Sequence, residues 1–489
     1  MDNVNRKIVT TNMFWRFLER CGAQFVTFVV SIVLARLLDP VVYGIVALVT
    51  VVTTFLQVFV DSGLGTALIQ KKDSDDLDFS TVFFFNLAMC FSLYLLIFFL
   101  APLFSHFYNN SQLTPLLRVL GVVLIISGVK NIQSAYVSKH FLFRKFFWAT
   151  LIGTIVASVV GISLAYYLPN DKKVWAIIIQ NVVNQTIDTI VLWIIVKWRP
   201  KLLFSWKRLK SLFSFGSKML LSALLDTGYN ELRSLVIGKR YTSEDLGYYN
   251  RGGQFPKFIV QNINTSIDSV LLPTMSLEQE NKHRVKQITR RAITTSTYVI
   301  FPCMVGLAVV APSLVHVLLT DKWMPCVLFL QLACISYAFW PVHTANLNAI
   351  KAMGRSDLFL ILEIIKKGIG IVLLIGAMFI SVEAIAWSGL IATIISFVIN
   401  SWPNRKLLNY SLVEQIKDMM PSLIISCIMG VIVYFIGFFN GNSIRTLFMQ
   451  VFYGVSIYFV GSSMFKLEPY LYILDTAKSF LGKKGDAIK

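Results

Sequence analysis

The segment LLDTGYNELRSLVIG, residues 224–238, is an apolar stretch that carries Asp226, Glu231 and Arg233 within eight residues. Apolar runs flank it on both sides, which indicates a helix that crosses a membrane. A charge near the centre of a bilayer costs roughly 2.5–3.5 kcal/mol on scales measured by translocon insertion. Charged residues in such helices therefore point toward other helices or toward water, and they mark paths for ligands and ions.

The rest of the chain is equally apolar. Of its 489 residues, 56% are hydrophobic and 15% are charged, which is too apolar for a soluble protein of this length. Runs of about 20 apolar residues recur throughout, each long enough to cross a hydrocarbon layer of ~30 Å. The chain is therefore predicted to be an all-α integral membrane protein with about 14 transmembrane helices. The predicted spans are 15–38, 43–69, 81–104, 115–137, 147–168, 175–196, 213–237, 248–273, 293–318, 326–350, 358–381, 384–402, 421–439 and 445–465.

The net charge of +19 follows the topology of such a protein and does not indicate a nucleic-acid partner. With the N-terminus inside, 29 of the 45 Lys and Arg residues fall at cytoplasmic ends of the spans, and seven fall outside. This positive-inside bias predicts that both termini lie in the cytoplasm. The polar start MDNVNRKIVTTN precedes a span too long for a signal-peptide core, so that span is predicted to be an uncleaved anchor.

Two parts of the chain match each other at an offset of 203 residues. LARLLDPVVYGIVALV, 34–49, lies opposite VIGKRYTSEDLGYYNRG, 236–252, so that Gly44 matches Gly247. Six spans per half give both halves the same orientation, as in the parallel repeats of transporters. This predicts two pseudo-symmetric six-helix lobes plus two extra C-terminal helices. The predicted domains are an N-lobe at 1–200, a C-lobe at 201–403, two further spans at 404–465 and a cytoplasmic amphipathic tail at 466–489.

Five of the predicted spans carry a polar face, with side chains repeating every three or four residues. A polar face on a membrane helix must meet other helices or water, and a single face is best explained by hydrogen bonds between helices. Five faces together predict a wet, polar cavity between the halves. The faces are Arg16, Arg20, Gln24, Thr27 and Ser31; Thr50, Thr54, Gln57 and Asp61; Asn181, Gln185 and Asp188; Lys218, Ser222, Asp226, Tyr229 and Arg233; and Arg251, Gln254, Lys257, Gln261, Asn264 and Asp268.

The charges inside the predicted spans favour an anionic ligand. Nine cations remain there against seven acids. Asp226 and Arg233 are seven residues apart, about 10.5 Å along a helix axis, so direct neutralisation is not expected. Cations without an acidic partner in a low-dielectric cavity form a binding site for an anion.

The sequence lacks motifs of catalysis and of cofactor or metal binding. It contains no phosphate loop GxxxxGK(S/T), no HExxH and no cluster of Ser, His and Asp. The six cysteines lie in or beside apolar runs without a CxxC pair and are predicted to be small core residues. We therefore expect neither an enzyme nor a bound cofactor or metal, and uphill transport would draw on a gradient of H⁺ or Na⁺.

Four motifs occur in order along the chain: ARLLDPVVYGIVALV, DSGLGTALIQKKD, LGYYNRGGQFPKF and LPTMSLEQENKHRVKQITRRA. They resemble the Wzx-type polysaccharide flippases of the multidrug/oligosaccharidyl-lipid/polysaccharide superfamily, over about residues 10–410. The resemblance is closest to the branch of colanic-acid and teichuronic-acid exporters. Many relatives carry an acid where this chain has Arg233, so a carboxylate role does not transfer to that position. The matching residues are Arg36, Gly44, Asp61-Ser62-Gly63, Gly247, Tyr249-Asn250-Arg251 and Pro273.

The resemblance implies two six-helix lobes in a V and transport by alternating access. It implies a flippase that moves undecaprenyl-pyrophosphate-linked oligosaccharide from the cytoplasmic to the outer leaflet of a bacterial cytoplasmic membrane, for surface polysaccharide biosynthesis. The partners would be this lipid-linked oligosaccharide, the membrane lipids and other polysaccharide assembly proteins.

Within that function the polar faces divide into three sets of side chains. Cations would neutralise the pyrophosphate and the sugar acids, carboxylates would couple transport to an ion, and neutral polar groups would meet sugar hydroxyls. The first set is Arg20, Lys218, Arg233, Arg251 and Lys257; the second is Asp61, Asp226 and Asp268; the third includes Tyr229 and Gln254.

Two other functions stay open at this point. A multidrug-type ion antiporter of the same superfamily would need a cavity biased toward acids and aromatic rings, whereas cations predominate here. A membrane polysaccharide polymerase or ligase would hold catalytic residues on a large outer loop, and the predicted outer loops are short.

Overall fold

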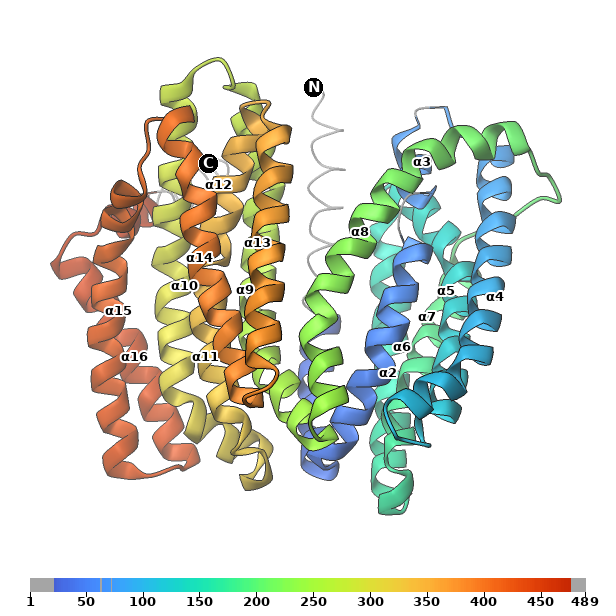
Figure 1. Ribbon diagram of the computed structural model, residues 1–489, viewed down its shortest axis with the longest axis horizontal. Helices are drawn as coiled ribbons and strands as arrows, with labels where there is room; N and C mark the ends of the chain where they lie inside the picture. Colours follow the sequence, from blue (N-terminus) through green and yellow to red (C-terminus); the bar gives the residue numbers. More distant parts are fainter. Residues whose placement is uncertain (1–21, 62–63, 72, 476–489) are drawn as a thin grey trace, which may run out of the picture. The chain divides into compact units, whose positions relative to one another are not determined.

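The computed structural model describes residues 22–61, 64–71 and 73–475, and the regular elements in these ranges are all helices. The chain divides into two units, residues 1–247 and 248–489, and α9 (Ser243–Leu277) begins in the first unit and continues into the second (Figure 1). The first unit contains the helix Gly22–Leu37, α2 (Pro40–Asp61), α3 (Leu64–Gln70), α4 (Asp76–Phe107), α5 (Leu113–Lys139), α6 (Phe143–Tyr167), α7 (Val174–Ile195) and α8 (Trp206–Arg240). The second contains α10 (Lys282–Leu319), α11 (Cys326–Ala338), α12 (Trp340–Ala352), α13 (Ser356–Ala377), α14 (Val382–Leu407), α15 (Leu412–Asn440) and α16 (Ile444–Met464).

Ten helices in the described part of the chain are long and apolar enough to cross a membrane, with α11 and α12 taken together as one. The other four predicted spans overlap helices that are shorter or more charged. These are the helix Gly22–Leu37, which is short, and α8, α9 and α13, which carry charged side chains within their length. The all-helical membrane fold is therefore confirmed, and the count of 14 spans stays a prediction, as do the lobe boundaries.

The first unit is built from neighbouring helix pairs. Helices α4 and α5 pack together, α6 packs on α7, and α5 contacts both α7 and α2. Glycines allow α6 and α7 to approach closely: a Cβ on Gly153 would lie 3.0 Å from that of Asp188, and one on Gly161 would lie 2.9 Å from the side chain of Gln180. This close packing fixes the face that α7 turns toward α5.

The first turns of α2 and α9 contact each other through two glycines. A Cβ on Gly44 would overlap the backbone carbonyl of Ser243, and a Cβ on Gly247 would overlap that of Pro40. Pro40 and Ser243 are separated by the same 203 residues as Gly44 and Gly247. The contact between these two segments is therefore reciprocal.

In the second unit, α10 packs against α11, α15 and α16, while α14 packs against α11, α12 and α13 (Figure 1). Helix α15 begins with a capping box, in which the Ser411 side chain accepts from the Glu414 amide and Glu414 accepts from the Ser411 amide. This start places Gln415 one turn inside α15, where it faces α12 and α14.

Three carboxamides join these helices, and we call Asn346, Asn404 and Gln415 the amide cluster. All three side chains are fully buried. Asn346 Nδ2 donates to Gln415 Oε1 at 2.9 Å, and Gln415 Nε2 donates back to Asn346 Oδ1 at 3.1 Å. Asn404 Nδ2 donates to the same Asn346 oxygen at 2.6 Å. In a medium of low dielectric constant such bonds hold three helices in one arrangement.

Candidate functional site

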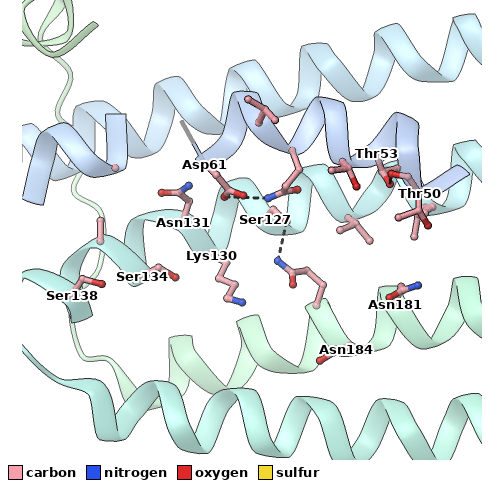
Figure 2. Close-up of a pocket in the computed structure, with 18 of the residues that line it drawn as sticks. Thr50, Thr53, Asp61, Ser127, Lys130, Asn131, Ser134, Ser138, Asn181 and Asn184 are labelled. Atoms are coloured by element: carbon pink, nitrogen blue, oxygen red, sulfur yellow. Dashed lines mark hydrogen bonds between the residues drawn. The ribbon is translucent and has the colours of Figure 1, made fainter. Parts of the chain in front are cut away.

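A polar cavity of about 750 Å³ lies in the first unit between α2, α5 and α7 (Figure 2). Its volume is within the range of small-molecule sites, roughly 300–1,000 Å³. Among the described residues, the polar lining consists of six hydroxyl side chains, five carboxamides, one carboxyl group and one ammonium group. They are Thr50, Thr53, Thr54, Ser127, Ser134 and Ser138; Gln57, Asn131, Asn181, Asn184 and Gln185; Asp61; and Lys130.

Three helix faces form the polar part of the lining, and two of them were predicted from the sequence. Helix α2 contributes the face that ends at Asp61, and α7 contributes the face that includes Gln185. The face on α5 was missed, although its polar side chains also repeat every three or four residues from Ser127 to Ser138. That spacing is the signal that sequence reasoning could have used. This cavity lies within the first unit. The cavity predicted between the halves stays a prediction.

A buried ion pair crosses the wall of the cavity. Lys130 Nζ on α5 lies 2.5 Å from Asp188 Oδ2 on α7, with 21% of the lysine side chain and 7% of the aspartate side chain exposed. Gly153 on α6 leaves the space in which Asp188 packs. The positive charge of Lys130 is therefore neutralised by a group from the neighbouring helix. Sequence reasoning placed Asp188 on a polar face but gave Lys130 no role.

Asp61 ends α2 and is exposed to the cavity. Its Oδ1 accepts a hydrogen bond from Gln57 Nε2 at 3.3 Å, and it forms no ion pair with any residue that the structure describes. Beside it, Asn131 Nδ2 donates to the carbonyl of Val60 at 2.6 Å and ties α5 to the end of α2. Figure 2 shows Asp61 and Asn131 next to each other, with Ser134 and Ser138 toward one end of the cavity and Thr50 and Asn181 toward the other.

The predicted ligand Arg251 lies on α9 in the second unit and is 3% exposed. One guanidinium nitrogen donates to Gln254 Oε1 at 2.7 Å, so the structure brings together two residues predicted for the same site. The guanidinium carbon lies 5.5 Å from the ring centre of Phe255 and 5.9 Å from that of Trp323. Arg251 therefore makes cation–π contacts as well as a hydrogen bond.

Further along α9, Lys257 and Asp268 are exposed. Asp268 Oδ1 accepts a hydrogen bond from Asn348 Nδ2 on α12 at 2.7 Å, and Asn348 is itself 2% exposed. Asp268 thus has a neutral partner from a neighbouring helix, whereas the neutral partner of Asp61, Gln57, lies on the same helix as Asp61.

Helix α8 contains the charged segment LLDTGYNELRSLVIG, residues 224–238. Arg233 is half-buried, and its Nε is buried without a hydrogen-bond partner among the described residues. Asp226 is exposed and Tyr229 is half-buried on the same helix. The side chain of Lys218 and the whole of Arg20 lie outside the described residues.

The model of the polysaccharide biosynthesis protein family matches residues 33–328 of this chain. The chain belongs to that family. The matched range covers α2 to α10 and therefore includes the whole lining of the cavity.

The chain is also similar to bacterial proteins that are named for polysaccharide biosynthesis. The teichuronic acid biosynthesis protein TuaB of Bacillus subtilis (strain 168) is 24% identical over 390 residues, which are 78% of this chain and 79% of the relative. The lipopolysaccharide biosynthesis protein WzxC of Escherichia coli (strain K12) is 21% identical over 328 residues, or 67% and 66% of the two chains. These relatives confirm the resemblance to Wzx-type flippases that the sequence motifs indicated.

The fold of this chain is similar to the folds of solved membrane proteins. The lipid II flippase MurJ in an inward closed conformation matches with a TM-score of 0.75 and 14% identity, over 92% of this chain and 98% of that chain. An inward-facing multidrug resistance MATE family transporter matches with a TM-score of 0.60 and 14% identity, over 80% and 96%. At such identity the likeness shows the fold alone. Family and fold together identify a multi-span membrane transporter.

Proposed function

We propose that the chain is a flippase that moves undecaprenyl-pyrophosphate-linked oligosaccharide repeat units from the cytoplasmic to the outer leaflet by alternating access. The polar cavity inside a unit of apolar helices carries this proposal. Polar groups inside a membrane protein are costly and line the paths of substrates and ions. Sugar hydroxyls both donate and accept hydrogen bonds, as do the hydroxyl and carboxamide side chains of the lining. The names of the teichuronic acid biosynthesis protein TuaB and of the lipid II flippase MurJ support the same substrate class.

Cations of α8 and α9 would bind the pyrophosphate. Arg233 supports this role, because its Nε is buried without a hydrogen-bond partner among the described residues and a guanidinium can grip a phosphate through paired donors. Arg251 and Lys257 would contribute from α9. Arg20 and Lys218 keep the same proposed role from the sequence.

Ion coupling would use a carboxyl group, and Asp61 is the first candidate. Its hydrogen-bond partner among the described residues is the neutral Gln57, so it would be able to take up a proton or bind a sodium ion as transport proceeds. Asp226 and Asp268 are the other two candidates. No cofactor has a place in this proposal beyond the coupling ion, H⁺ or Na⁺.

The test is a flipping measurement with the purified protein in liposomes that contain undecaprenyl pyrophosphate linked to a fluorescent trisaccharide. We expect the label to reach the opposite leaflet faster than in protein-free liposomes, and faster again when a proton or sodium gradient is imposed. A protein that leaves the label in place but accumulates ethidium would be a multidrug antiporter. A protein that lengthens the glycan would be a polymerase.

A further inference from the structure

We infer that the cavity of the first unit binds uncharged sugars of the substrate and rejects both the pyrophosphate and acidic sugars. The inference rests on the proposed function and adds the substrate class that this one site takes. It separates two tasks: neutral hydrogen bonding in the cavity between α2, α5 and α7, and anion binding by cations elsewhere in the chain.

The lining supplies the hydrogen bonds that a neutral sugar needs. Among the described residues, eleven neutral polar side chains line the cavity against two charged ones. A hydroxyl side chain donates one hydrogen bond and accepts others, and a carboxamide offers both an acceptor oxygen and a donor NH₂ group. A sugar hydroxyl uses both kinds, whereas a phosphate or carboxylate oxygen only accepts. The carboxamide oxygens of the wall are also acceptors, so they could form no hydrogen bond with an anion.

Each wall of the cavity holds at least one such group ready for a ligand. Thr54 on α2, Ser134 on α5 and Asn184 on α7 line the cavity, and their side chains make no hydrogen bond with another described residue. Apolar side chains such as Val58 and Leu120 also line the cavity, and the C–H faces of a sugar ring would pack against them. The site therefore offers polar groups for the hydroxyls of a sugar ring and apolar side chains for its C–H faces.

The charges in the cavity oppose an anion. The ammonium group of Lys130 is held at 2.5 Å by Asp188, so separating them would leave a carboxylate with 7% exposure unpaired. Asp61 faces the cavity and forms no ion pair with a described residue. An entering phosphate or uronate would meet a like charge with no available cation, whereas a sugar hydroxyl would donate to the Asp61 carboxylate.

The experiment compares three probes that share one short lipid: farnesyl pyrophosphate, the same lipid linked to a neutral dihexose, and the same lipid linked to a hexose–hexuronate. Dissociation constants are measured with the full-length protein in detergent. We expect the dihexose probe to bind about tenfold more tightly than farnesyl pyrophosphate, since two new hydrogen bonds contribute about that much. The hexuronate probe is expected to bind no more tightly than farnesyl pyrophosphate.

Variants of the cavity assign the difference to this site. We expect Asn184→Ala and Ser134→Ala each to reduce the tenfold preference to about threefold while the affinity for farnesyl pyrophosphate is unchanged. The matched controls are Asn440→Ala and Ser92→Ala, whose side chains bond only to their own helices away from the cavity. Asn184→Lys adds a cation to the wall and should raise affinity for the hexuronate probe.

The outcomes separate this inference from the proposed function. Equal binding of the dihexose and hexuronate probes, or an undiminished preference in both cavity variants, would overturn the inference and leave the flippase proposal in place. If none of the three probes binds, the proposed function fails and the inference fails with it. Melting temperatures of Asn184→Ala and Ser134→Ala close to that of the unaltered protein establish that the variants are folded.

Discussion

The amide cluster of the second unit and the cavity wall of the first unit use the same side chains in different settings. In the amide cluster, Asn346, Asn404 and Gln415 are fully buried and hydrogen-bond to one another across three helices. In the cavity wall, Asn181 is exposed and donates only to the Ile177 carbonyl of its own helix, at 3.0 Å. Asn184 makes no side-chain hydrogen bond with another described residue. The partner therefore decides whether a carboxamide stabilises the fold or stays available to a ligand.

The pair Lys130–Asp188 stands between these two cases. The pair lies at the cavity, yet its two charges neutralise each other. It joins α5 to α7, as the hydrogen bonds of the amide cluster join their three helices. The comparison thus predicts a gradient of effects on stability, from the amide cluster through this ion pair to the exposed groups of the lining.

Breaking the amide cluster should cost the most stability. Asn346→Leu removes the side-chain oxygen that accepts from Gln415 Nε2 and from Asn404 Nδ2, and each buried group left unpaired costs about 1–3 kcal/mol. We expect a loss of roughly 2–6 kcal/mol, measured as a lower melting temperature in detergent. Asn440→Ala is the control, because the Asn440 side chain is exposed and donates only to the Ile436 carbonyl of its own helix. An unchanged melting temperature for Asn346→Leu would remove the distinction between the two regions.

Lys130→Met should have the next largest effect on stability. It leaves Asp188 unpaired with 7% of its side chain exposed. Breaking a buried pair costs about 3–5 kcal/mol, and we expect about 2–4 kcal/mol because Lys130 itself keeps partial exposure. The double variant Lys130→Met with Asp188→Leu should recover most of the melting temperature, since no uncompensated charge is left. A double variant as unstable as the single one would contradict an energetic role for the pair.

Arg233→Ala should leave stability nearly unchanged, by less than about 1 kcal/mol, because its Nε bonds to no described residue. Flipping should be abolished, and Arg233→Lys should retain part of it, since lysine binds phosphate as a point charge. Melting temperature and flipping are measured on the same preparations. A markedly destabilised Arg233→Ala that is rescued by also removing Glu231 or Asp226 would instead make Arg233 a structural ion-pair partner.

Asp61→Asn should change stability least, because the side chain is exposed in the cavity and asparagine keeps its shape. Transport should lose its acceleration by an imposed gradient while binding of the neutral probe persists. Asp268→Asn is the comparison variant, because Asp268 accepts from the buried Asn348 and its replacement disturbs that contact. Gradient-driven flipping that persists in Asp61→Asn and disappears in Asp268→Asn would move the coupling role to the second unit.

The sequence predicted two of the polar helix faces that line the cavity, because helical spacing is a local property. The polar faces of α2 and α7, with Asp61 at the end of one of them, could be found from side chains three and four residues apart. The pairing of Gly44 with Gly247 at a fixed offset was also visible. The face on α5, with Ser127, Asn131, Ser134 and Ser138 around Lys130, was open to the same reasoning and was overlooked.

The sequence by itself determined the membrane helices, since their length and apolar character depend only on neighbouring residues and on the thickness of the bilayer. Tertiary structure alone decided which polar groups bind to another helix and which remain able to bind a ligand. Lys130 and Asp188 meet from positions 58 residues apart, and Asn346 and Gln415 from positions 69 apart. Such pairs form because packed helices bring particular faces together at particular heights. The spacing of residues along one helix carries no information about the height or rotation of its neighbour, so the partner of each group had to come from the fold.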